Sequence, residues 1–100
     1  MDKKHFFVKL IPPRPTFTED ITAEERSIMN KHIVYWREKM DKGMVIVFGP
    51  VFDPKGGYGM GIIEADSEDD AKDFAEGNPA GLAGLVTYEI YPMKAVMPER

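Results

Sequence analysis

The feature that most constrains the fold is a long helical pattern that leads directly into an apolar segment. Thr22 and Glu25 have the spacing of a capping box, and Gly43 stands where a helix commonly ends. Between them, apolar residues at helical spacing form one stripe: Met29, Ile33, Trp36 and Met40. Five apolar residues, Met44–Phe48, follow at once and predict a strand buried on both faces. A helix joined directly to a buried strand indicates a mixed α and β domain.

The other predicted elements complete a familiar order. Branched and aromatic residues predict strands at His5–Ile11, Tyr58–Ala65 and Leu85–Tyr91. A second helix is expected to begin after Ser67, which can cap it, and to end at Gly77. We therefore predict an α+β fold of ferredoxin-like βαββαβ topology, an antiparallel sheet with two helices on one face. Irregular connections are expected at three places: Pro12–Asp20, Val51–Gly57 and Asn78–Gly84.

Length and composition narrow the class of protein. One hundred residues, 43% of them hydrophobic, suit a single domain over residues 1–100 with one core. The net charge of −4, without a stripe of Lys and Arg, argues against nucleic acid as a partner. No apolar run approaches the length of a membrane span, and no signal-peptide pattern forms at the start. We expect a cytoplasmic protein with no membrane association, which the absence of cysteine fits.

The sheet is expected to need a partner. Met44–Phe48 is apolar on both faces, and Lys9 is the one polar residue from Phe6 to Ile11. Two helices can cover only one face of a four-stranded sheet. A second copy of the same sheet, related by a two-fold axis, would bury the other face. We therefore predict a homodimer that closes through the open sheet face.

One pair of residues could carry proton chemistry. His32 lies within the long helix, on the flank of its apolar stripe, where an imidazole is partly desolvated and still reachable. The next strand runs back along the helix, so the loop with Asp53 is expected near the level of His32. A carboxylate there could accept a hydrogen bond from one ring nitrogen and fix the tautomer. The alternative is a structural or solvated histidine and an Asp-Pro turn.

Other motifs have a structural and a functional interpretation. The glycines of Gly57-Tyr58-Gly59-Met60-Gly61 enter a strand and open no helix, so they do not form a phosphate loop. They leave one side of the strand bare, for a packed ring or for a pocket wall. Pro12-Pro13-Arg14-Pro15 is either a stiff connection or a lid. The acidic run at 66–70 suits a helix start, and no metal site is predicted.

The longest specific pattern is the segment from Phe48 to Gly59, which contains Gly-Pro-x-x-Asp-x-x-Gly, with His32 seventeen residues before its first glycine. Together with Asn78-Pro79 and Thr87–Met93, it makes the chain resemble the YCII-like (YCII-related) family of small bacterial proteins. The resemblance implies a dimeric α+β barrel of ferredoxin-like protomers, with His32 and Asp53 as the catalytic pair. One departure is Asn78, where the family usually has aspartate.

The resemblance also suggests a class of reaction. Relatives are similar to dehydrochlorinases and muconolactone isomerases, which act on small ring compounds from aromatic degradation. We therefore expect a lyase or isomerase without cofactor, in which His32 is general acid and base and Asp53 orients it. Residues expected to bind the substrate are Tyr35, Gly49, Pro50 and Tyr58. The alternatives are a non-catalytic homodimer that binds a small molecule and a structural partner domain.

Overall fold

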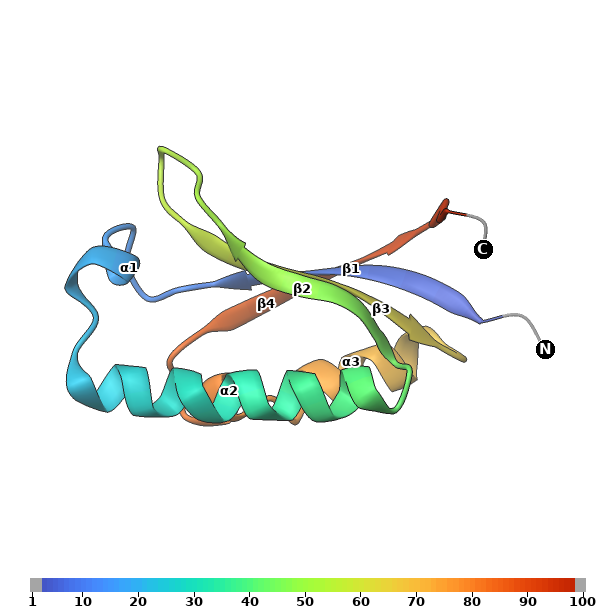
Figure 1. The fold of residues 1–100 in the computed structure, drawn as a ribbon, viewed down its shortest axis with the longest axis horizontal. Coiled ribbons are helices and arrows are strands. Elements are labelled where there is room, and N and C mark those ends of the chain that lie inside the picture. Colours follow the sequence, from blue (N-terminus) through green and yellow to red (C-terminus); the bar gives the residue numbers. More distant parts are fainter. Residues whose placement is uncertain (1–2, 99–100) are drawn as a thin grey trace.

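Four strands form one antiparallel sheet in the computed structural model, which describes residues 3–98 (Figure 1). The strands are β1 (Lys4–Ile11), β2 (Val45–Val51), β3 (Tyr58–Ala65) and β4 (Thr87–Met93). Their order across the sheet is β2-β3-β1-β4, so β2 and β4 form the edges. This is the predicted ferredoxin-like topology. The outer ends of the predicted domain, residues 1–2 and 99–100, lie outside the described residues.

The two long helices lie on the same face of the sheet, as predicted (Figure 1). They are α2 (Ala23–Asp41) and α3 (Glu68–Glu76). The capping box of α2 is confirmed, because the Thr22 hydroxyl accepts from the Glu25 N–H at 3.1 Å and the Glu25 carboxylate accepts from the Thr22 N–H at 2.9 Å. Gly43 follows the helix with a φ of 86°, which glycine adopts without strain.

Both edge strands end later than predicted and contain a proline, and β4 also begins later, at Thr87 and not at Leu85. β2 continues through Pro50 to Val51, and β4 continues through Pro92 to Met93. Proline has no N–H to give to a neighbouring strand, but an edge strand has one side without such a neighbour. The predicted ends at Phe48 and Tyr91 were therefore wrong.

Two of the connections predicted to be irregular contain a single helical turn. The first is α1 (Phe17–Asp20), which buries Phe17, and the second is α4 (Pro79–Leu82), which buries Ala80. A four-residue helix is too short to show a helical periodicity in the sequence. Both turns add apolar side chains to the helical side of the sheet.

The core is centred on Trp36 of α2, which has no exposed surface. Its indole meets Phe74 of α3 edge-on, with 4.7 Å between ring centroids, and lies 5.5 Å from Phe48. Under the indole lies Gly61 of β3, where a Cβ would overlap Cζ3 and come within 2.7 Å of Cη2. At this position the glycine therefore serves packing, because the ring fills the space of a side chain.

The buried side of α2 differs from the predicted stripe. His32 is 7% exposed, whereas Ile33 is 46% exposed. The predicted flank position of His32 is buried because α4 packs against that side of α2. The helix therefore turns His32 and Trp36 toward the interior.

The sheet face away from α2 and α3 is not covered by a helix within residues 3–98 (Figure 1). Phe7 stacks on Tyr91 there, with 6.2 Å between ring centroids. Val47 is 49% exposed, so one face of β2 is open in the single chain, and its predicted burial depends on a second copy. No helix in the described part of the chain combines the length and apolar character needed to cross a bilayer.

We expect Gly61→Ala to lower the free energy of unfolding by about 2–3 kcal/mol, because the added methyl group overlaps the Trp36 indole. Gly49→Ala is the matched control, since nothing lies within 4 Å of the added carbon, and its effect should stay within about 0.5 kcal/mol. Urea denaturation measures both values. Equal losses in the two variants would contradict the packing role of Gly61.

Candidate functional site

A cavity of about 210 Å³ lies between α2, the segment before it and strands β1 to β3. Most of its wall is apolar: Leu10, Phe17, Met29, Ile33, Trp36 and Phe48. Of the lining residues, only His32 and Tyr58 carry ionisable side chains. Backbone at Gly57 and Gly59 completes the wall, so these two glycines serve the pocket while Gly61 serves packing.

His32 is held by a buried hydrogen bond from a different part of the fold. Its Nδ1 lies 2.8 Å from Oδ1 of Asn78, the residue that caps α4. Burial lowers the pKa of His32 below its ordinary value of 6.5, and the hydrogen bond with Asn78 opposes this effect in part. The imidazole is therefore uncharged at neutral pH. A neutral ring nitrogen in a cavity wall can accept a proton from a bound molecule.

The structure does not form the predicted hydrogen bond between His32 and Asp53. The Asp53 carboxylate accepts from the Lys55 N–H at 2.9 Å, within the turn between β2 and β3. The loop that contains it projects from the side of the sheet opposite α2 (Figure 1). The prediction compared lengths along the helix and the strand, but it did not include the twist that turns β2 away from α2.

The predicted substrate-binding residues divide into two groups. Gly49, Pro50 and Tyr58 line the cavity, and the Tyr58 ring carries the Lys9 ammonium 4.7 Å from its centroid. Tyr35 does not line it, because its hydroxyl donates to the Phe74 carbonyl at 2.8 Å and its ring stacks on Phe74. Burial raises the pKa of Tyr35, which keeps this hydroxyl a donor.

Sequence reasoning missed two residues of this region. Asn78 was identified only as a departure from the family pattern, and Phe17 was placed in an irregular connection. The available signal for Asn78 was its place directly before proline, which is typical of a helix cap. Nothing in the sequence indicated that this cap would face His32, because 46 residues separate the two.

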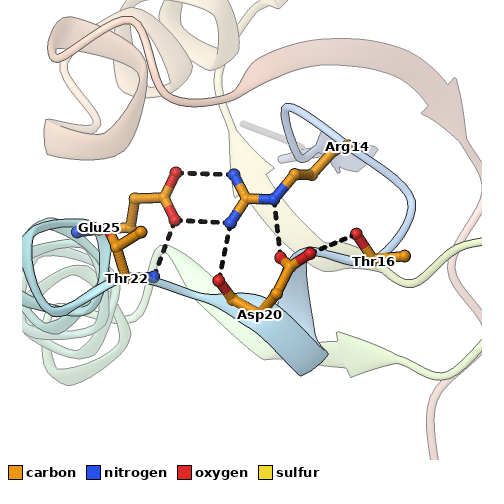
Figure 2. Close-up of polar contacts among 5 residues, drawn as sticks. All are labelled: Arg14, Thr16, Asp20, Thr22 and Glu25. Atoms are coloured by element: carbon orange, nitrogen blue, oxygen red, sulfur yellow. Dashed lines mark hydrogen bonds and ion pairs between the residues drawn. The ribbon is translucent and has the colours of Figure 1, made fainter.

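The segment between β1 and α2 forms one wall of the cavity and is braced by Arg14. The guanidinium donates to both carboxylate oxygens of Glu25, at 2.7 and 2.8 Å, and to Oδ1 of Asp20 at 2.7 Å (Figure 2). The hydrogen bonds from Arg14, together with that from the Thr22 N–H, lower the pKa of Glu25 to about 2. Thr18 and Pro12 of this segment line the cavity, so the proline-rich stretch contributes a braced wall.

No three acidic or histidine side chains come together among residues 3–98 in a way that could hold a metal ion.

Comparisons with known proteins place the chain by sequence and by fold. The family model of the YCII-related domain matches residues 5–94. The solved structure of 5-chloro-2-hydroxyhydroquinone dehydrochlorinase from Burkholderia phenoliruptrix, in complex with 2,5-dihydroxybenzoquinone, is similar with a TM-score of 0.66 and 22% identity. The match covers 89% of this chain and 93% of that chain, so the two share a fold. Among curated proteins, none matches the sequence.

We expect the stability of the native protein to fall more steeply than that of His32→Gln as the pH decreases below 6.5. The unfolded chain binds a proton at His32 near its ordinary pKa, whereas the folded chain binds it only at lower pH. The contribution of the neutral imidazole to the free energy of unfolding is therefore fully present above pH 6.5 and decreases as the pH falls below this value. Urea denaturation of both proteins between about pH 7.5 and pH 5 measures the difference, and parallel curves would contradict a buried neutral His32.

Proposed function

Because the chain belongs to the YCII-related domain family, we propose that it is a cofactor-independent lyase or isomerase that moves protons on a small ring compound. The observation that carries this proposal is a buried, neutral imidazole in the wall of an apolar cavity. In this role His32 is the general base that takes a proton and the general acid that returns it.

Elimination of hydrogen chloride from a hydroxylated ring is a reaction that such a site supports. A hydroxyl proton passes to the base, and a proton is returned to the ring carbon that bears chlorine, so that this hydroxyl becomes a ring carbonyl. Loss of a second hydroxyl proton forms a second carbonyl while chloride leaves with the electron pair of its bond to carbon, so the ring becomes a quinone and no external oxidant is consumed. The dehydrochlorinase with the same fold acts on a chlorinated hydroxyhydroquinone, which makes this compound class the first to test.

The cavity favours an uncharged ring over a carboxylated one. Its volume of about 210 Å³ exceeds the roughly 150 Å³ of an apolar cavity known to bind benzene. None of its lining residues is a lysine or an arginine. A carboxylate placed there would lose its hydration without gaining a counter-ion from these residues, which is costly. A hydroxylated aromatic ring would therefore fit this site better than a lactone acid.

The main alternative is a protein that binds a ring compound without turning it over. One observation favours it: Asp53, the second predicted catalytic residue, makes its hydrogen bond within its own turn and not with His32. In a homodimer formed through the open sheet face, the β2–β3 loop would lie beside the second copy, because the loop projects from that face (Figure 1). Asp53 could then contribute to a site between chains.

We expect the native protein to release chloride from 5-chloro-2-hydroxyhydroquinone, and His32→Gln to lower kcat/KM by at least about 100-fold. A chloride electrode measures the reaction, with circular dichroism to confirm that the variant is folded. Asp53→Asn is the second arm. If Asp53→Asn lowers kcat/KM as much as His32→Gln does, Asp53 belongs to the site. If Asp53→Asn retains the native kcat/KM, His32 transfers protons without Asp53. Binding without chloride release would support the alternative for this substrate.

We further propose that the open sheet face joins two copies of the chain. Apolar side chains on this face and on the adjacent loop are exposed in the single chain: Val47, Phe52, Tyr91 and Met93. Burying such a patch against its own copy about a two-fold axis is the simplest closed arrangement.

We expect a mass of twice 11.3 kDa by analytical ultracentrifugation at micromolar concentration. Val47→Glu should shift the protein toward the single-chain mass, because it introduces a charge into the proposed interface. Val34→Glu is the matched control, since Val34 of α2 is equally apolar and 56% exposed but lies on the helical side. A native protein with the mass of one chain would contradict the homodimer.

A further inference from the structure

We propose that Asn78 is a positioning residue that holds His32 as the tautomer with the proton on Nδ1, so that Nε2 faces the cavity as a proton acceptor. The inference deepens the proposed function, since it names the atom of His32 that reacts. It concerns the free protein and can therefore be tested without a substrate.

The orientation of the Asn78 amide follows from its role as a helix cap. Asn78 is 1% exposed and caps α4, where its Oδ1 accepts from the backbone N–H of Ala80 at 3.4 Å. Turning the amide round would place the Nδ2 donor against this N–H, which is also a donor. Oδ1 therefore faces both Ala80 and His32.

This orientation determines which nitrogen of His32 carries the proton. A carbonyl oxygen can only accept, so Nδ1, 2.8 Å from Oδ1, must donate. A neutral imidazole has one N–H, and with that proton on Nδ1 the other nitrogen keeps a free lone pair. Burial favours the neutral ring because it penalises the charged form.

The other ring nitrogen, Nε2, is directed toward the cavity. His32 lines the cavity whereas Asn78 does not, so the Nδ1 edge of the ring is turned toward α4 and away from the cavity. Nε2 has no hydrogen-bond partner among residues 3–98 and is not among the fully buried unpaired atoms. It is the ring nitrogen that a bound hydroxyl group would meet.

No charged side chain modifies this arrangement from the elements around the ring. The residues one turn before and after His32 in α2 are uncharged: Ile28, Met29, Tyr35 and Trp36. The packed elements α4 and β2 contain no ionisable residue, and Tyr58 is the other ionisable group in the lining. The Asn78 amide is therefore the main polar influence on the ring.

The direct test is two-dimensional ¹H–¹⁵N NMR of the His32 ring in the free native protein above its titration. We expect Nδ1 to have the chemical shift of a protonated nitrogen and Nε2 that of an unprotonated one. The opposite assignment would overturn the proposal. Because no substrate is present, this result is independent of whether the protein turns over chlorinated rings.

Two variants separate positioning from capping. Asn78→Ser keeps a good cap for α4, but its side chain is too short to reach His32. We expect the ring of this variant to populate both tautomers, with a several-fold loss of kcat where turnover is observed. Unchanged ring shifts in Asn78→Ser would contradict a positioning role.

Asn78→Asp keeps the acceptor and adds a negative charge. We expect the titration midpoint of His32 to rise by about 1–3 pH units, with Nδ1 still protonated, because a carboxylate stabilises the imidazolium. The acidic limb of any pH–rate profile should shift in the same direction. A midpoint equal to that of the native protein would overturn the contact, and circular dichroism checks the fold of both variants.

Discussion

The contact between the Trp36 indole and the backbone at Gly61 sets the distance between the long helix and the sheet. A side chain at this glycine would occupy the volume of the ring and would hold the helix farther from the sheet. Phe74 and Phe48 then enclose the indole from α3 and β2. Because His32 lies one turn before Trp36 on the same helix, the contact also determines how far the imidazole stands above the cavity.

A second constraint is the hydrogen bond between α2 and the short helix α4. The cap of a one-turn helix, Asn78, gives its oxygen both to its own helix and to His32. Both residues are buried, so the loss of this bond would leave a buried polar group unpaired. The polar chemistry of the site thus depends on a short connection, and the shape of the site depends on the aromatic core.

Local patterns were sufficient to predict most of the framework. The capping box at Thr22, the glycine at position 43 and the apolar strands indicated the order of elements and hence the topology. Long-range geometry was not available from those patterns. The twist of β2 turns the Asp53 loop away from α2, and the meeting of His32 with Asn78 depends on how α4 packs. Spacing along the chain contains neither quantity, although it did single out the histidine.

The Arg14 brace has a consequence for how the cavity responds to its surroundings. Hydrogen bonds from Arg14 lower the pKa of Glu25 to about 2, so mild acidification leaves the ion pair between these two residues intact. The ion pairs of Arg14 lie at the surface, where dissolved salt screens them. Mild acid is therefore expected to act on His32, whereas added salt is expected to weaken the ion pairs that brace the wall.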